Sequence, residues 1–183
     1  MDLDQVKDDL TKVLVTEDQI VSRVKELALE VDKLYSGKDL LLVGVLKGAV
    51  MFMADLSREM QIPVSMDWMA VSSYGSGTQS SGVVRILKDL DADVLGRHVL
   101  IVEDIIDSGL TLSWLASNLS ARGAASVQIV AFLRKPLAAK VDVEVALVGF
   151  DIPNEFVVGY GLDWNEKYRT LKAVGVLSPA VYS

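Results

Sequence analysis

Short apolar runs alternate with longer segments of helical periodicity along most of this chain. Residues 40–46 and 127–133 contain almost no polar side chains, which is typical of strands buried on both faces of a parallel sheet. The same reasoning predicts further strands at 63–71, 83–87, 99–102, 145–150, 156–159 and 174–177. We expect the last of these to return to the same sheet.

Helices are predicted between these strands. Thr16 and Gln19 have the spacing of a capping box, and the helix that they open ends at Ser36 and Gly37. Its core face is predicted to contain Ile20, Val24, Leu27, Val31 and Leu34. Further helices are predicted over 49–60 and from 110 onward. This alternation predicts an α/β domain with right-handed crossovers and a mostly parallel sheet covered on both faces.

The composition narrows the class of protein. The chain has 183 residues, a formal net charge of −7, no cysteine and a single histidine, so we expect one domain without disulfides, thiolate chemistry or a His-rich metal site. The acidic balance argues against a broad nucleic-acid-binding surface. No apolar run approaches membrane-spanning length, and the N-terminus lacks the pattern of a signal peptide. We therefore expect a cytoplasmic protein without a membrane or nucleic-acid partner.

The most informative stretch is residues 99–111, which read Val-Leu-Ile-Val-Glu-Asp-Ile-Ile-Asp-Ser-Gly-Leu-Thr. An apolar strand is followed directly by Glu103 and Asp104, and the turn that begins at Asp107 opens a helix. A glycine-containing turn at a helix N-terminus is a good site for a phosphate. The alternative is that Asp107 merely caps the helix. Capping leaves the repulsion between the other two carboxylates unexplained, unless a cation or a hydroxyl group binds them.

Polar residues follow two other strands as well. Lys47 and Gly48 come after the strand 40–46, and Lys135 comes after the strand 127–133. Because ligands of open parallel sheets bind outside the carboxyl ends of the strands, we expect these groups to converge with the 103–111 segment on one site. By itself the Lys-Gly pair is equally consistent with an ordinary loop, and the glycine loop of a Walker motif is missing.

Other features have both a structural and a functional interpretation. The Ser- and Gly-rich segment 72–82 resembles an interdomain linker in composition, but too little chain precedes it for a domain, which favours a mobile cover over the site. His98 is expected to be solvated, and no second histidine is present for a Ser-His-Asp hydrolase. We expect Trp68 and Trp114 to be packing residues and Trp164 to lie near the ligand.

Residues 99–111 closely resemble the phosphoribosyl-pyrophosphate motif of the type I phosphoribosyltransferases. Four further segments are similar to the 6-oxopurine branch of that family, the hypoxanthine-guanine phosphoribosyltransferases: 44–48, 72–75, 133–135 and 156–166. The resemblance implies the type I phosphoribosyltransferase fold in a single domain over 1–183. It further implies a core of about 36–150, a small hood from about 1–20 and 151–183, and a lid at about 72–83.

The resemblance also implies an activity, namely transfer of the 5-phosphoribosyl group from phosphoribosyl pyrophosphate to N9 of hypoxanthine or guanine. The products are IMP or GMP and pyrophosphate, and Mg²⁺ is the cofactor. Asp107 is then the general acid/base near purine N7, and Leu110 contributes only its N–H. The residues implied to hold phosphoribosyl pyrophosphate are Lys47, Gly48, Glu103, Asp104, Asp107, Ser108, Gly109, Leu110, Thr111 and Arg169.

The same resemblance assigns the purine, the metal and the lid. The implied purine-binding residues are Lys135, which donates to O6, Phe156, which stacks on the base, Val157 and Asp163. The implied Mg²⁺ ligands are Glu103, Asp104 and Asp163. The implied lid residues are Ser73 and Tyr74, and the Leu46–Lys47 peptide is a candidate for the cis form. Relatives of this kind are commonly homodimers or homotetramers.

Two other classes share parts of this pattern. A regulator with the same fold that binds RNA would need a basic surface, which a net charge of −7 does not provide. A response-regulator receiver also joins acidic residues, a Thr and a Lys at strand ends. Its acidic pair should follow the first strand, whereas here several predicted strands precede Glu103. The pattern therefore favours the enzyme over both alternatives.

Overall fold

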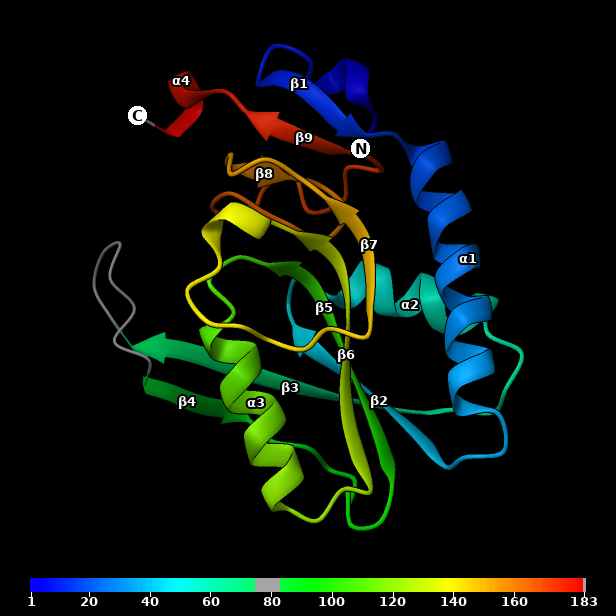
Figure 1. The fold of residues 1–183 in the computed structure, drawn as a ribbon. Helices are drawn as coiled ribbons and strands as arrows, with labels where there is room; N and C mark the ends of the chain where they lie inside the picture. Colours follow the sequence, from blue (N-terminus) through cyan, green and yellow to red (C-terminus); the bar gives the residue numbers. More distant parts are fainter. Residues whose placement is uncertain (75–82, 183) are drawn as a thin grey trace.

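The computed structural model describes residues 1–74 and 83–182. Its main sheet has six strands in the order β4-β3-β2-β5-β6-β7 (Figure 1). Their bounds are Leu40–Leu46 for β2, Ser65–Tyr74 for β3, Val83–Lys88 for β4, His98–Ile106 for β5, Ser126–Arg134 for β6 and Leu147–Asp151 for β7. Every neighbouring pair is parallel except β3–β4, which is antiparallel. The predicted α/β class and the mostly parallel sheet are confirmed.

The main sheet separates two apolar cores, one on each face. α1 (Glu17–Tyr35) and α2 (Val50–Glu59) cover one face, and α3 (Leu110–Ala121) covers the other (Figure 1). Leu40 and Leu42 of β2 pack with residues of α1 and α2, whereas Leu41 and Val43 pack with residues of α3. Because successive strand residues point to opposite faces, an entirely apolar strand such as β2 contributes to both cores.

Helix α1 largely follows its predicted pattern. Its capping box is present, because Gln19 N–H donates to the Thr16 hydroxyl at 3.4 Å and Thr16 N–H donates to Gln19 Oε1 at 2.9 Å. Leu34, however, is 42% exposed, and Tyr35 is buried in its place. At 3.6 residues per turn, Leu34 lies at the edge of the buried stripe and Tyr35 lies within it. The Tyr35 hydroxyl donates to Gln128 at 2.8 Å.

Segments near the two ends of the chain form a second sheet, in the order β1-β9-β8 with antiparallel pairs. Its strands are Leu10–Val15 for β1, Val157–Val158 for β8 and Val174–Leu177 for β9. Figure 1 shows this sheet at one end of the main sheet. The prediction that 174–177 returns to the main sheet is therefore wrong. All residues of β9 are buried where it pairs with β1 and β8, so its apolar character does not require a place in the main sheet.

The remaining elements are short. They are helical turns at Leu3–Gln5 and Pro136–Ala138 and the helix α4 at Pro179–Tyr182. Among the helices of the described ranges, none is both long enough and apolar enough to cross a membrane. The predicted lid lies mostly outside the described residues. Only its two ends appear, as the last residues of β3 and the first residue of β4, and Ser72 pairs with Arg85 of β4. The side chains of Ser73 and Tyr74 are not described.

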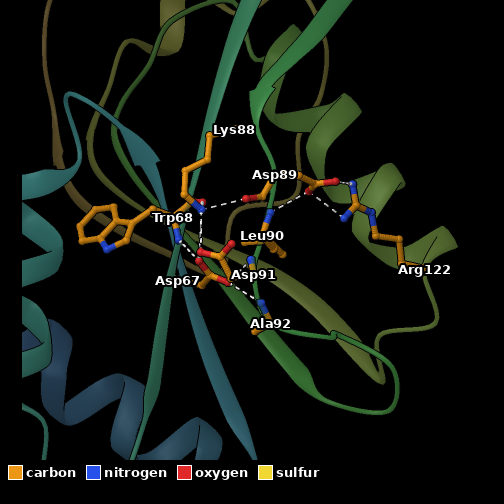
Figure 2. A network of polar contacts seen from close by, with 8 residues as sticks. All are labelled: Asp67, Trp68, Lys88, Asp89, Leu90, Asp91, Ala92 and Arg122. Carbon is orange, nitrogen blue, oxygen red and sulfur yellow. Dashed lines mark hydrogen bonds and ion pairs between the residues drawn. The ribbon is translucent and has the colours of Figure 1, made fainter.

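A buried carboxylate fixes the base of the β3–β4 hairpin (Figure 2). Asp67 is 6% exposed and accepts hydrogen bonds from the N–H groups of Trp68 at 2.7 Å and of Asp91 and Ala92 at 2.8 Å each. The ammonium group of Lys88 lies 3.7 Å from the same carboxylate. Burial raises the pKa of Asp67, but the three N–H groups and Lys88 lower the pKa by more, so that it lies below its usual value.

The loop after β4 is also joined to α3. Two hydrogen bonds connect the Asp89 carboxylate with the Arg122 guanidinium, at 2.8 and 3.0 Å (Figure 2). Because Arg122 is the C-cap residue of α3, this pair attaches the loop to the end of that helix. The hairpin is therefore anchored at its base on both the sheet and a helix.

Candidate active site

A cleft lies at the carboxyl ends of β2, β5 and β6, against the segment that contains β8. Its lining residues come from separate parts of the chain: Lys47, Gly48, Asp104, Ile105, Asp107, Lys135, Phe156, Val157, Leu162, Asp163, Glu166 and Arg169. The structure thus brings most of the predicted site residues together. Glu103 and residues 108–111 adjoin the cleft along the chain but do not line it.

The backbone at Gly48 is in close contact with two other segments. A Cβ atom on Gly48 would lie 1.6 Å from Oδ2 of Asp104, and a Cβ atom on Gly161 would lie 2.0 Å from the Gly48 carbonyl oxygen. The preceding Leu46–Lys47 peptide is cis. Only glycine permits such an approach of backbone to carboxylate. The N–H groups of this loop are consequently held beside Asp104, where a bound anion can reach them.

The Glu103 and Asp104 carboxylates are buried with less compensation than their charges require. Oε2 of Glu103 is buried and has no hydrogen-bond partner among the described residues. Burial and, to a smaller extent, the charge of Asp104 raise the pKa of Glu103 well above its usual value. Burial also raises the pKa of Asp104 to about 6, although the Ile105 N–H, 2.8 Å from Oδ1, and the Arg169 charge oppose this. Two neighbouring acids of this kind favour a ligand that brings hydroxyl groups or a cation.

Strand β5 is longer than predicted, which changes the position of these two acids. The sequence predicts a strand that ends at 102, but β5 continues to Ile106 because its pairing with β6 extends from His98↔Ser126 to Ile106↔Arg134. Glu103 and Asp104 are therefore strand residues with well-defined backbone positions. Their polar side chains hide this in the sequence, because strands are recognised there by apolar runs.

The donor set suits Mg²⁺ that shares its ligands with a bound phosphate. Within the described ranges, no group of three or more His, Cys, Asp or Glu side chains is placed to hold a metal ion alone. Mg²⁺ is commonly held by one or two carboxylates together with substrate phosphates and water. Asp104 and Asp163 both line the cleft, and the unpartnered oxygen of Glu103 adjoins it. These residues therefore fit the predicted metal role.

The N-terminus of α3 is open to an anion. Its N-cap residue is Gly109, with φ 78°, and within this described part of the chain no side chain caps the helix. Leu110 N–H lies 3.5 Å from the Ser108 hydroxyl, which is too long for a strong hydrogen bond. The alternative that Asp107 caps the helix is therefore wrong. The first-turn N–H groups, with the hydroxyls of Ser108 and Thr111 nearby in sequence, can receive a phosphate.

Lys135 brings a buried cation to the cleft. It directly follows β6 and is 8% exposed. Its N–H donates to the Ile106 carbonyl at 2.9 Å, and its ammonium group lies 3.4 Å from Oδ2 of Asp107. A lysine is almost never this buried unless it has partners. The long contact with Asp107 leaves donor capacity for a ligand in the cleft.

The segment 159–169 carries a second group of charges. Arg169 lies 2.8 Å from Asp163 and 3.3 Å from Glu166, and it also donates to the Gly161 carbonyl. Glu166 in turn lies 2.9 Å from the Lys47 ammonium group. The sequence interpretation did not assign a role to Glu166, although a carboxylate three residues before Arg169 was a visible signal.

The backbone of this segment is strained. Residues in the left-handed region that are not glycine are Tyr160, Asn165, Glu166 and Tyr168, with φ between 49° and 69°. Such conformations are uncommon outside glycine, and they cluster at functional sites where the surrounding structure holds them. One such constraint is the Tyr160 hydroxyl, which donates to Asp55 of α2 at 2.8 Å. The loop is thus fixed against the helix that follows Lys47.

Three aromatic rings form a cluster beside the cleft, and one of them, Phe156, lines it. Phe156, Trp164 and Tyr182 are 36–40% exposed, and their ring centroids are 5.2 to 5.9 Å apart. Phe156 lines the cleft, whereas Trp164 supports Phe156 from the side and does not line the cleft. Trp68 and Trp114 pack against the two cores, as predicted.

Comparisons with known proteins agree with this geometry. The sequence model of the phosphoribosyl transferase domain matches residues 12–165. The chain is 56% identical over 180 residues to the hypoxanthine-guanine phosphoribosyltransferase of Mycobacterium tuberculosis (strain ATCC 25618 / H37Rv), covering 95% of this chain and 89% of that protein. It is 52% identical over 177 residues to the enzyme of the same name from Bacillus subtilis (strain 168), covering 97% and 98%.

Solved structures give the same result. A crystal structure of a hypoxanthine phosphoribosyltransferase from Staphylococcus aureus superposes with a TM-score of 0.95 at 47% identity, covering 98% of this chain and 97% of that chain. A mutant of the Trypanosoma cruzi hypoxanthine phosphoribosyltransferase, in a ternary complex with substrates, superposes with a TM-score of 0.91 at 42% identity, covering 96% and 100%. The fold and the order of the elements are therefore shared over nearly the whole chain.

Proposed function

This chain belongs to the phosphoribosyl transferase family, and we propose that it transfers the 5-phosphoribosyl group from phosphoribosyl pyrophosphate to N9 of hypoxanthine or guanine. The products are IMP or GMP and pyrophosphate, so the enzyme acts in purine salvage. The choice of substrates rests on one observation. The same cleft is lined by Lys135 and Phe156 and also by Lys47, Gly48 and Asp104. The first two residues suit a 6-oxopurine, and the other three suit a phosphorylated sugar.

The phosphoribosyl group is held by the β5–α3 region. The N–H groups from Ser108 to Thr111, together with the two hydroxyls, bind the 5′-phosphate at the N-terminus of α3. Glu103 and Asp104 accept hydrogen bonds from the ribose hydroxyls, which supplies a partner for the unpaired Glu103 oxygen and replaces the hydration that Asp104 loses on burial. Mg²⁺, held by these acids and by Asp163 at a second position, supplies positive charge against the phosphates when bound.

The purine is read by residues of β6 and the β8 region. Lys135 donates a hydrogen bond to O6 of the base. An amino group at the same position of a purine cannot accept this hydrogen bond. Phe156 stacks on the ring, and the backbone of Val157 contacts its edge. Asp107 lies 3.4 Å from Lys135, and this proximity supports a role for Asp107 as the general acid/base on the O6–N7 side of a base bound in this way.

The reaction breaks the bond between C1′ and the pyrophosphate oxygen while N9 of the purine attacks C1′. Positive charge develops on the ribose and negative charge on the leaving group. N–H groups at Lys47 and Gly48 and the Arg169 guanidinium stabilise the leaving pyrophosphate, because preorganised donors act most strongly where charge develops. Asp107 takes the proton at N7 in synthesis and returns it in the reverse reaction. We infer assembly into a homodimer or homotetramer from the same family relationship.

The proposal is tested by nucleotide formation from phosphoribosyl pyrophosphate and Mg²⁺ with hypoxanthine, guanine, xanthine or adenine in parallel. We expect rapid formation of IMP and GMP and no formation of AMP, because adenine carries an amino donor where Lys135 needs an acceptor. The rate with xanthine reports how the 2-position is read. A folded chain that forms nucleotide from none of these bases would show the proposal to be wrong.

A further inference from the structure

The Glu166 carboxylate forms ion pairs with two cations of the cleft, Lys47 and Arg169, on the side proposed to bind pyrophosphate. Its Oε1 lies 2.9 Å from the Lys47 ammonium group, and its Oε2 lies 3.3 Å from the Arg169 guanidinium. Arg169 is shared with Asp163, at 2.8 Å. The two cations and the two carboxylates of this cluster thus cancel in formal charge before any ligand binds. Hydrogen bonds from Lys47 and Arg169, and to a smaller extent their charges, lower the pKa of Glu166.

We propose that Glu166 pairs with Lys47 and Arg169 in the ligand-free enzyme and is displaced from them when pyrophosphate or phosphoribosyl pyrophosphate binds. The inference rests on the proposed function, because that function assigns the backbone N–H of Lys47 and the guanidinium of Arg169 to the pyrophosphate group. The Lys47 ammonium group is the further donor that displacement of Glu166 releases. Glu166 is then an internal competitor of the ligand. Its carboxylate keeps the cations in place and lowers the affinity for the ligand at the same time.

The exposure of these side chains makes the displacement easy. The side chains of Glu166 and Lys47 are each 65% exposed, and exposed ion pairs contribute little because water and salt screen them. Pyrophosphate carries several negative charges and accepts more hydrogen bonds than one carboxylate does. It therefore competes successfully for both cations at once.

The backbone of Glu166 is held independently of its side chain. Its N–H donates to Oδ2 of Asp163 at 2.8 Å, and its φ is 62°. The side chain can consequently rotate away from the cations while the loop keeps its conformation. A neutral side chain of the same length should preserve the loop and remove only the competition.

The test compares Glu166→Gln with the wild type in calorimetric titrations with pyrophosphate and Mg²⁺, and separately with phosphoribosyl pyrophosphate and Mg²⁺. We expect Glu166→Gln to bind pyrophosphate about two- to fivefold more tightly at low salt, since an exposed ion pair changes an affinity by at most about fivefold. Inhibition by product pyrophosphate should strengthen by the same factor, with an unchanged KM for hypoxanthine. The ratio of the pyrophosphate affinity of Glu166→Gln to that of the wild type should fall toward one in high salt, because salt screens the ion pairs.

A matched control is Glu26→Gln, which removes the same charge from a carboxylate paired with Arg23 at 2.9 Å on α1. We expect it to leave the pyrophosphate affinity unchanged. Glu166→Ala removes the carboxylate together with most of the side chain, and it should also tighten the binding of pyrophosphate. Equal or weaker binding of pyrophosphate by a folded Glu166→Gln variant would overturn the inference. If the wild type binds neither pyrophosphate nor phosphoribosyl pyrophosphate, the proposed function itself is wrong.

Discussion

At the scale of single residues, Asp104 and Asp107 lie close together in the chain but in different environments. Asp104 is partly buried against the Gly48 backbone, and burial raises its pKa to about 6. The Asp107 side chain is 59% exposed and lies beside Lys135. One carboxylate is thus prepared for a ligand that replaces its lost hydration, and the other is accessible for proton transfer. This difference in environment supports the different roles proposed for them.

Asp107→Asn should reduce kcat by about a hundred- to ten-thousandfold, which is the usual contribution of a general acid/base. The side chain is exposed, so its amide should not change the thermal unfolding temperature. Steady-state rates of IMP formation and a circular dichroism melt measure the two quantities. Turnover close to that of the wild type would remove Asp107 from the mechanism.

Lys135→Gln should raise KM for hypoxanthine by about ten- to a hundredfold, because a hydrogen bond from a charged donor contributes about 1.5–3 kcal/mol. KM for phosphoribosyl pyrophosphate should change far less. Lys140→Gln, on the loop that follows the helical turn Pro136–Ala138, is the matched control and should leave both values unchanged. Equal losses for the two substrates would contradict the contact with O6.

Asp104→Asn should stabilise the ligand-free protein at neutral pH while it impairs activity. The folded chain binds the Asp104 proton more tightly than the unfolded chain does, because the pKa is raised from 3.8 to about 6. Stability is therefore lost as the pH rises from about 4 to about 6, by up to about 2 kcal/mol once water in the cleft is allowed for.

Thermal unfolding of the Asp104→Asn variant at two pH values measures this effect. Its unfolding temperature should exceed that of the wild type at pH 7.5, and the difference should nearly vanish near pH 3, where the wild-type carboxyl is mostly protonated in both the folded and the unfolded state. A variant that is less stable at pH 7.5 would show that Asp104 has a compensating partner.

At the scale of elements, the strands of the main sheet carry buried carboxylates in two opposite environments, one rich in hydrogen-bond partners and one poor in them. Asp67 at the base of the β3–β4 hairpin accepts three backbone hydrogen bonds (Figure 2), and its pKa lies below the usual value. Glu103, in β5, has an unpartnered buried oxygen. Satisfied buried carboxylates stabilise a fold, whereas unsatisfied ones reduce its stability and are retained where a ligand needs them.

Asp67→Asn should destabilise the protein by about 3 kcal/mol, because the amide nitrogen would face backbone N–H donors that lose their acceptor. For a domain of this size that is a decrease in unfolding temperature of roughly 6–12 °C. The matched control is Asp91→Asn, since the Asp91 side chain is 89% exposed; we expect a change of less than about 0.5 kcal/mol.

The contribution of Asp67 to the stability of the fold depends on pH with the opposite sign to that of Asp104. A lowered folded-state pKa stabilises the fold above the unfolded pKa, and this contribution is lost as the pH falls through the folded pKa. The difference between Asp67→Asn and the wild type should therefore narrow in acid. A difference that is constant between pH 7 and pH 3 would show that ionisation of Asp67 is unimportant.

At the scale of the whole molecule, an acidic protein is proposed to bind a highly anionic substrate. The net charge of −7 repels such a ligand at long range. Affinity must therefore come from local donors, namely the N-terminus of α3, the Lys47–Gly48 loop, and the cations Lys135 and Arg169. These groups come from distant parts of the chain and meet only where the second sheet lies against one end of the main sheet (Figure 1).

Phosphoribosyl pyrophosphate with Mg²⁺ should raise the unfolding temperature. At a hundred times its Kd a ligand stabilises the fold by about 2.7 kcal/mol, which corresponds to roughly 5–10 °C here. Removal of the metal with EDTA should abolish most of this shift, because the acids of the cleft would then face the phosphates directly. Differential scanning fluorimetry measures both effects, and a shift that is fully retained in EDTA would count against the metal's role.

Much of this molecule follows from local sequence pattern. The buried strand at 40–46, the capping box at Thr16 and the helix after Gly109 were predictable because each depends on residues adjacent in the chain. The candidate site residues were predictable because motif segments carry them together, and parallel strands deliver their ends to one edge of a sheet. The lid residues and the roles of the individual site residues remain predictions.

Tertiary structure decided what depends on distant partners. Val174–Leu177 has the composition of a main-sheet strand, but it pairs with β1, a strand whose exposed residues show little pattern. Tyr35 lies in the core in place of Leu34, and Gln128 on β6 accepts the hydrogen bond of its buried hydroxyl. Glu166 forms an ion pair with Lys47, although the two are 119 positions apart in the sequence. Hydrophobic periodicity reports whether a residue is buried, but only the packed chain determines which groups it meets there, because those contacts depend on distances that no local pattern contains.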